Sequence, residues 1–536
     1  MMLFQTNNIF NVFRLRNTFH VIIHNKYHSA PFLKLYKKTT GELPSPKYLD
    51  DLKRKHPSLE CLSHDRLQTT LDILEKFNIT PYEACKDPHL FCMNPITMDN
   101  YGEILRECGF ITIIPKYLIR YHTMVRSRTL KQLKKEGLID GDLQLKDKLE
   151  QCFENWPSSH KLSQDFDEMS TSILTIRMYI LEKYLNWKLN VSTEEFQKYC
   201  KHYLPLKHKP MQDIQEAISI AQTDIGFTQE TVRRNGFVIS SDPVNTRLIL
   251  DNIPTIAGQD IREAIKIEPA ILKNNYNGLL QIRSILEEYR ISAEAQRNCL
   301  KIYCMCPETV RERLEELVQL KEYQMLKSNP RVLSMVVHKK KMLSRLTKMN
   351  AANKQCYSLN HLISSKKVFN NYIGNFGSKA CGRDIAILIS TCLQSSIDTK
   401  TSASAISSKT TAASIVKRLK KHKFWLHTAL SVIDDNIKFL QKWFQNEVIF
   451  NNCHLLLYPG FDIQQHIEFF LGMRNSNGYK QETIPLDSSY NNIRYGKLTD
   501  DQILALTLYE IEKKYHFSGD GIWSKQDPCR TESQLS

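Results

Sequence analysis

The stretch Asn329-Pro330-Arg331-Val332-Leu333, followed by Met342, Leu346 and Met349, contains the pattern from which we predict the fold. Proline lacks a backbone N–H and fixes φ, so it is tolerated in the first turn of a helix but not further inside it. Apolar residues three and four positions apart indicate a longer helix with one buried face. The stretch therefore predicts a unit made of a short helix and then a longer one.

Similar proline openings recur at residues 87–91, 114–118 and 268–272. The first two units are each expected to stop at a glycine, Gly109 and Gly137, as helices often do. Glycine is scarce, 18 residues of 536, against a usual share of about 7%. Recurrence of one supersecondary unit is typical of a solenoid. We predict an all-α fold, a curved α-solenoid of divergent two-helix and three-helix repeats.

The N-terminal segment differs from the rest in charge. Residues 1–41 contain no acidic residue, and Glu42 is the first; they carry Arg14, Arg16 and four lysines among apolar and hydroxyl residues. An acid-free, Arg-bearing amphipathic segment is typical of a mitochondrial transit peptide. We predict this role for residues 1–41, with a disordered basic arm as the alternative, and location in the mitochondrial matrix, at the nucleoid.

Composition divides the remaining chain into segments. Serine and threonine make up about half of the segment 390–414, which predicts a flexible insert. Thr499 is expected to cap a final helix whose first-turn acids and last-turn lysines match the helix dipole. The predicted segments are 42–64 linker, 65–389 helical repeats, 390–414 insert, 415–474 further repeats, 475–498 polar linker, 499–517 helix and 518–536 disordered tail.

Catalytic and metal-binding motifs are not found. The sequence has no glycine-rich phosphate loop, no HExxH and no GxSxG, so we predict no enzymatic activity, cofactor or small-molecule substrate. Cys85, His89 and Cys92 could share a helix face, but structural zinc sites normally use four ligands, and we favour a packing role. No run approaches the roughly 18 apolar residues of a membrane span, so no membrane partner is expected.

Basic residues form three groups. Lysine plus arginine number 73 against 57 aspartates and glutamates, and an excess of 10 remains without residues 1–41. Such an excess favours binding to polyanions. A single stripe would more often be a solvated helix face, but three stripes with little nearby acid favour a phosphate-binding surface. The predicted nucleic-acid-binding residues are Arg126, Arg128, Lys131 and Lys135; His338, Lys341, Arg345 and Lys348; and Lys417, Arg418, Lys420, Lys421 and Lys423.

Together these features resemble the mitochondrial transcription termination factor (mTERF) family. The basis is the N-terminal segment, the repeated Pro-x-x-[Leu/Ile/Val] openings and the two-helix units that close on Gly or Asn; residues 329–350 match best. The segment from Leu457 to Phe470 is one more candidate unit. The resemblance implies a solenoid whose concave basic surface holds double-stranded DNA, with some bases extruded onto aromatic or arginine side chains.

The resemblance also implies a function. We predict a site-bound roadblock or modulator of mitochondrial transcription that acts on mitochondrial DNA, with another family member or the mitochondrial RNA polymerase machinery as candidate protein partners. Two alternatives stay open at this point. One is a ribosome-assembly factor that binds mitochondrial ribosomal RNA, and the other is a non-catalytic adaptor whose solenoid grips a protein.

Overall fold

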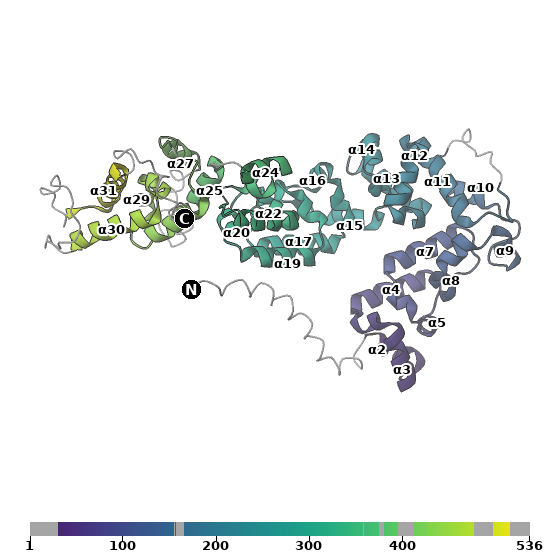
Figure 1. The fold of residues 1–536 in the computed structure, drawn as a ribbon. Coiled ribbons are helices and arrows are strands. Elements are labelled where there is room, and N and C mark those ends of the chain that lie inside the picture. Colours follow the sequence, from purple (N-terminus) through teal and green to yellow (C-terminus); the bar gives the residue numbers. More distant parts are fainter. Residues whose placement is uncertain are drawn as a thin grey trace, which may run out of the picture. The chain divides into compact units, whose positions relative to one another are not determined.

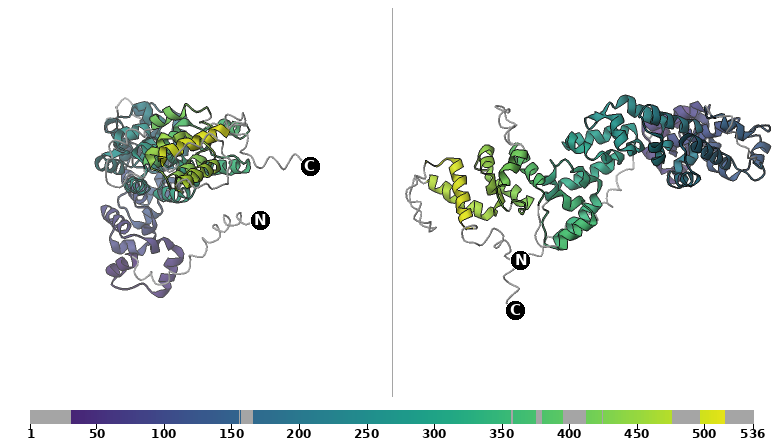
Figure 2. Two further views of the ribbon diagram at one scale, coloured as in Figure 1. Left: turned by 90° about the vertical axis from the view of Figure 1, so that its left-hand side faces the viewer. Right: turned by 90° about the horizontal axis from the view of Figure 1, so that it is seen from above.

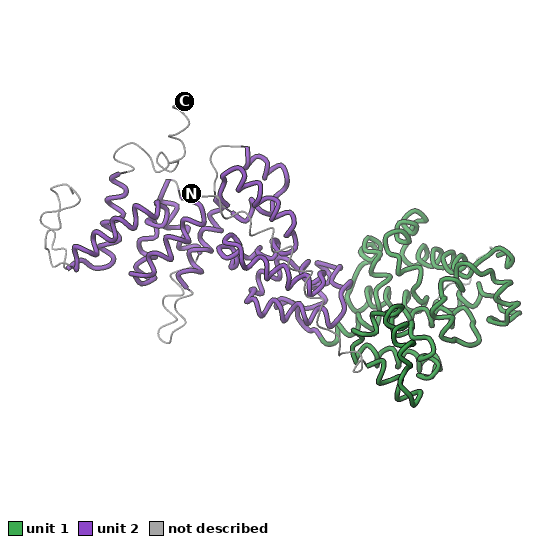
Figure 3. Tube along the Cα trace, turned by 60° about the horizontal axis from the view of Figure 1, so that its bottom comes forward, with its two compact units in different colours: residues 1–252 green, residues 253–536 purple. Residues whose placement is uncertain are grey.

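The computed structural model describes residues 31–154, 156, 166–356, 358–374, 380–394, 412–423, 425–475 and 497–514. Within these ranges the chain is built almost entirely of helices (Figures 1 and 2). It divides into two compact units, residues 1–252 and 253–536 (Figure 3). The predicted all-α class is therefore confirmed.

Unit 1 contains α-helices and short 3-10 helices labelled η, of which η4 is a single π turn. In chain order they are α2 (Pro31–Thr40), α3 (Pro46–Lys55), η3 (Pro57–Cys61), α4 (His64–Lys76), α5 (Pro81–Lys86), α6 (His89–Cys92), α7 (Pro95–Glu107), α8 (Pro115–Ile119), η4 (Thr123–Ser127), α9 (Leu130–Lys135), α10 (Leu145–Glu150), α11 (Ile173–Leu189), α12 (Thr193–His202), η6 (Leu204–His208), α13 (Met211–Thr223), α14 (Gln229–Arg234), η7 (Gly236–Ser240) and α15 (Pro243–Asn252).

Unit 2 opens on a two-stranded antiparallel hairpin in which Thr255 pairs with Asp260. Its elements are β1 (Thr255–Ile256), β2 (Gln259–Asp260), α16 (Ile261–Ile267), η8 (Pro269–Lys273), α17 (Tyr276–Glu288), α18 (Ala293–Arg297), η9 (Leu300–Cys304), α19 (Pro307–Val318), α20 (Lys321–Leu326), α21 (Leu333–Val337), α22 (Lys339–Ala351), α23 (Leu359–Ile363), α24 (Lys366–Gly374), α25 (Gly382–Gln394), α27 (Ala412–Leu419), α28 (Leu430–Leu440), α29 (Asn446–Asn451), η10 (Cys453–Leu457), α30 (Gly460–Asn475) and α31 (Asp500–Glu512).

The predicted short-then-long units are present. Pro269 opens η8, which is followed by α17, and α21 after Pro330 is followed by α22. The late candidate unit is also helical, since η10 precedes α30. Short helices pack on short helices of the next repeat, as η8 does on η9, and long ones on long ones, as α17 does on α19. Packing between sequence neighbours is the rule of a solenoid, and this architecture is confirmed.

Helix ends follow the local signals in the sequence. Gly109 and Gly137 come after α7 and α9 with positive φ, a left-handed conformation that favours glycine. Thr499 caps α31 in a capping box with Gln502, as its sequence predicts. The two lysines expected in the last turn of this helix lie just past its end, where Lys514 pairs with Asp462 at 2.6 Å.

One predicted boundary at the N-terminal side is wrong. The segment 42–64 is not a linker, because α3 and η3 lie in it and bury Leu52 and Leu59. Pro46 and Pro57 stand at the first positions of these helices, where proline is tolerated, rather than in an extended connection. The last ten residues of the predicted transit peptide form most of α2, which is packed into the first repeat.

The serine- and threonine-rich insert begins later than predicted. Residues 390–394 are the last turn of α25, in which Ser390 and Leu393 are buried, and residues 412–414 open α27. The intervening part of the insert, most of the predicted polar linker 475–498 and the predicted tail 518–536 lie outside the described residues. Serine and threonine at these helix ends are accommodated because their hydroxyls bond nearby carbonyls, as Ser390 does to the Ile387 carbonyl at 3.0 Å.

A buried ion pair joins three helical elements of unit 1. Arg177 on α11 is 2% exposed, and its Nη1 lies 2.6 Å from Glu107 Oε2 at the end of α7. Its Nη2 donates to the Lys209 carbonyl at 2.7 Å, and the Met211 amide at the start of α13 donates to Glu107 Oε1 at 2.7 Å. Burial opposes the charged form of Arg177, but Glu107 together with the nearby Cys108 and Tyr121 acts in the opposite direction, and the pKa of Arg177 is raised.

We expect Arg177→Met to destabilise unit 1 by about 3–5 kcal/mol, because the buried carboxylate loses its partner. Urea unfolding followed by circular dichroism measures this change. The control is Arg247→Met, which breaks an exposed ion pair with Glu216 and should leave the unfolding midpoint nearly unchanged. Equal midpoints for the two variants would show that the buried pair is not a stabilising element.

Candidate nucleic-acid interface

Helix α22 presents the predicted apolar face. Met342, Leu346 and Met349 are buried at 0%, 8% and 1% exposure, as their spacing predicts. Arg345, which the sequence places on a neighbouring basic stripe, is itself only 5% exposed. The prediction that this arginine stands on a solvent-facing ridge is wrong.

Arg345 points into the next repeat rather than into solvent. Its Nη1 donates to the carbonyls of His361 (3.2 Å) and Leu362 (2.9 Å), and its Nη2 to those of Ser364 (2.7 Å) and Ser365 (3.1 Å). The guanidinium carbon also lies 4.6 Å from the ring centroid of Phe369. The first three carbonyls lie in or just after the last turn of α23, so the arginine caps that helix and complements its dipole. The Ser365 carbonyl also accepts the Phe369 amide of α24.

The same device recurs along the chain. A donor side chain of one element reaches the carbonyls that end a short helix further along the sequence. The donors are Arg66 for α6 (Cys92 and Met93 carbonyls, both 3.0 Å), Asn274 for η9 (Tyr303, 3.1 Å; Met305, 2.9 Å), Arg313 for α21 (Val336, 2.9 Å; Val337, 3.0 Å), Arg418 for α29 (Asn451, 3.1 Å) and Asn436 for η10 (Leu456, 3.1 Å; Tyr458, 2.9 Å). We call these side chains, with Arg345, the inter-repeat caps.

The other cations of the α22 stripe differ in their surroundings. Lys341 is exposed and donates to the Ile363 carbonyl at 3.0 Å, while Lys348 is exposed on the last turn. His338 is mostly exposed just before the helix. The partial burial of its imidazole, together with the charges of Lys341, Lys301 and Arg313, lowers the pKa of His338. Lys301 of η9 therefore belongs to this cationic surface, although no periodic signal in the sequence links it to α22.

In unit 1, acidic side chains lie close to the predicted basic group of Arg126, Arg128, Lys131 and Lys135 and neutralise part of its charge. Arg128 forms an ion pair with Glu136, whereas the Nζ of Lys131 lies 3.4 Å from the Met169 sulfur. Lys134, beside the stripe, pairs with the Glu168 carboxylate at 2.6 Å. The expectation of little nearby acid is wrong here. Arg126 and Lys135 are exposed, and the described residues include no ion pair for either.

The third group retains the most exposed charge. Lys417, Lys420, Lys421 and Lys423 are exposed at the end of α27 and in the turn after it. Arg418 is half-buried, since it caps α29 and stacks over Phe450 with 4.5 Å between guanidinium carbon and ring centroid. The turn is anchored by buried His422, whose Nε2 is 3.0 Å from the Tyr458 hydroxyl.

An aromatic cluster lies beside Arg126, and the sequence provided no signal for it. The rings of Tyr101 and Tyr121 stack at 3.8 Å between centroids, and Tyr101 Oη is 3.0 Å from Nε2 of exposed His122. Tyr121 is buried and its Oη lies 3.1 Å from His208 Nδ1. Tyr101 and His122 are the accessible members, so aromatic and cationic groups meet at this surface.

The described residues hold little that points to catalysis or metal binding. No group of at least three His, Cys, Asp or Glu side chains could hold a metal ion there, and Cys85, His89 and Cys92 do not form one.

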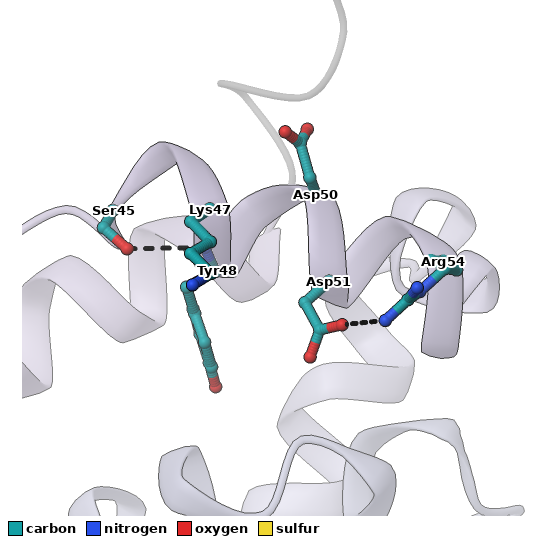
Figure 4. A pocket seen from close by; sticks show the side chains of 6 residues that line it. All are labelled: Ser45, Lys47, Tyr48, Asp50, Asp51 and Arg54. Carbon is teal, nitrogen blue, oxygen red and sulfur yellow. Dashed lines mark hydrogen bonds and ion pairs between the residues drawn. The ribbon is translucent and has the colours of Figure 1, made fainter.

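A cavity of about 510 Å³ is lined by Ser45, Lys47, Tyr48, Asp50, Asp51 and Arg54 (Figure 4). Hydrogen bonds from Lys55 and Arg54 lower the pKa of Asp51, so this carboxylate is committed to ion pairs. Among the helices described, none is long and apolar enough to cross a membrane.

These features define a helical-repeat protein with cationic surface patches. Comparison with known proteins agrees. The chain is 29% identical over 483 residues to the mitochondrial transcription termination factor 5 of Drosophila melanogaster, covering 89% of this chain and 81% of that protein. No family model matches the chain, and no solved structure matches it. This similarity supports the resemblance of the chain to the mitochondrial transcription termination factor family.

We expect Arg345→Lys to destabilise the protein by about 2–3 kcal/mol although the charge is kept, because an ammonium group cannot reproduce the forked bonds to four carbonyls. Lys348→Ala is the matched control on the same helix and should leave stability unchanged. Chemical denaturation of both variants measures the difference. Equal stability of Arg345→Lys and the unchanged protein would contradict the capping role.

Acidification should destabilise unit 1 through His208. Burial lowers the pKa of His208 to about 4, and the charges of His122, Arg126, Arg177 and Lys207 act in the same direction. The unfolded chain has a pKa of about 6.5 and takes up the proton first, so stability falls as the pH drops from about 6.5 to about 4. Unfolding midpoints between pH 7 and pH 5 should show a smaller slope for His208→Gln. An unchanged slope would exclude His208 as its source.

Proposed function

We propose that this protein acts in mitochondria as a nucleic-acid-binding regulator of transcription that stays bound to double-stranded mitochondrial DNA and obstructs or modulates the RNA polymerase. The observation that carries the proposal is the similarity, over nearly the whole chain, to a protein named as a mitochondrial transcription termination factor. This role needs tight, salt-sensitive binding and no bond-making chemistry.

The exposed lysines support binding to phosphates. Lys417, Lys420 and Lys421 are closely spaced exposed cations at the C-terminal end of a helix, where the helix dipole favours positive charge but leaves the ammonium groups free to turn outward. Each phosphate that a lysine neutralises releases condensed counterions, so affinity falls steeply with salt. These contacts hold a duplex without reading its sequence.

The cationic surface near α22 supports the same role with a smaller set of residues than the sequence suggests. Lys301, His338, Lys341 and Lys348 remain candidates, whereas the guanidinium of Arg345 is occupied by carbonyls. In unit 1, Arg126 and Lys135 remain candidates, and Arg128 is paired with Glu136. The accessible Tyr101 and His122 beside Arg126 are suited to stacking with bases, which would add discrimination among sites.

We expect the triple variant Lys417→Ala/Lys420→Ala/Lys421→Ala to bind duplex mitochondrial DNA more weakly at all sequences. The slope of log K against log salt should shrink by about 2–3, because up to three phosphate contacts are lost. The control removes the same charge from other exposed positions, Lys198→Ala/Lys201→Ala/Lys442→Ala. Fluorescence anisotropy across a salt series measures both, and equal slopes for the two triples would contradict the proposed interface.

Crosslinking in intact mitochondria, with sequencing of both the bound DNA and the bound RNA, tests the target itself. The proposal expects enrichment of discrete mitochondrial DNA sites. Enrichment of ribosomal RNA alone, with co-sedimentation on a ribosomal subunit, would overturn it in favour of ribosome assembly. Absence of either nucleic acid would overturn it in favour of an adaptor that grips a protein.

A further inference from the structure

Helix α2 belongs to the folded first repeat. Phe32 and Leu33 are 1% and 3% exposed, among the most buried side chains of this unit. The ring of Phe32 lies 5.1 Å from that of Phe91 on α6, also 1% exposed. The hydroxyl of Thr39 lies 3.6 Å from the Cys85 sulfur on α5. The helix therefore covers apolar groups of two later helices, and its removal would expose them to water.

The outer face of α2 is cationic. Lys34, Lys37 and Lys38 are exposed, and the helix contains no acid. A helix with one apolar face and one lysine-bearing face has the composition that identifies transit peptides, so composition alone cannot separate the two. Burial bears on the choice: Phe32 and Leu33 are packed into the interior of the full chain, so removing them with a transit peptide would expose the apolar groups that they cover.

We propose that the targeting segment is confined to residues 1–30 and that a protease removes it at a peptide bond N-terminal to Pro31, which leaves α2 in the mature protein. The inference rests on the mitochondrial location of the proposed function. The step is hydrolysis: water supplies the hydroxyl of the new carboxylate and the proton of the new amine, with no cofactor. Arg14 and Arg16 lie in the removed segment, while all three lysines of α2 stay.

The first test is N-terminal sequencing, by terminal-amine labelling and mass spectrometry, of the full protein purified from mitochondria. We expect its first residue to fall between positions 17 and 31, because the removed segment includes Arg14 and Arg16. A first residue between 32 and 42 would overturn the inference, because α2 would be cut or lost. Recovery of only chains that start between Met1 and Arg16 would overturn it as well.

The second test asks whether α2 is needed for stability. A chain starting at Pro31 should match the mature protein in thermal midpoint, whereas a chain starting at Glu42 should unfold about 5–10 °C lower. In the full chain Phe32→Ala should lower the midpoint in the same direction, and Lys34→Ala, on the exposed face of the same helix, should not. Equal midpoints for the chains starting at 31 and 42 would overturn the inference.

The third test separates this inference from the proposed function. Residues 1–30 fused to a reporter should be sufficient for import into mitochondria, and import by residues 1–41 but not by 1–30 would overturn the inference alone. A mature protein that starts at or before Pro31 but crosslinks to neither DNA nor RNA would leave the inference standing and overturn the proposed function.

Discussion

The structure depends on satisfying the carbonyl groups at the ends of many short helices. Each short helix leaves its last carbonyls without a partner, and a chain of stacked short helices buries several such ends. The inter-repeat caps supply the missing donors, from Arg66 near the N-terminal side to Asn436 in unit 2. Because each cap belongs to an earlier element than the helix it serves, it also fixes how one repeat sits on the next.

Capping of helix ends and binding of phosphates both call for arginine side chains. A guanidinium suits both the carbonyl end of a helix and a phosphate, since it offers a planar set of donors with a permanent charge. In Arg345 and Arg313 the structural use takes priority, because a buried carbonyl without a donor is costly whereas a surface phosphate contact is optional. The lysines next to Arg345 on α22 stay exposed, and they are the residues left for a polyanionic partner.

The buried ion pair of Arg177 and Glu107 follows the same logic in unit 1. Glu107 accepts from the first amide of α13 while Arg177 donates to the Lys209 carbonyl, so the pair satisfies a helix start and the chain just before it. The inter-repeat contacts therefore rest on a few hydrogen-bonded polar groups set in an apolar interior. The acids around Arg128 and Lys134 are different, since they are exposed and reduce the local positive charge without fixing the fold.

The sequence by itself determined the kind and order of the elements: the proline openings, the glycine stops at Gly109 and Gly137, the Thr499 cap and the buried faces of the helices. These signals are local, because they depend on backbone chemistry and on helical period within a few residues. Only the tertiary structure decided which cations pair with other groups and which later helices α2 packs against. Those outcomes depend on groups far apart in sequence, such as Arg345 and the end of α23 or Phe32 and Phe91, and no periodicity reports which neighbour a side chain will meet.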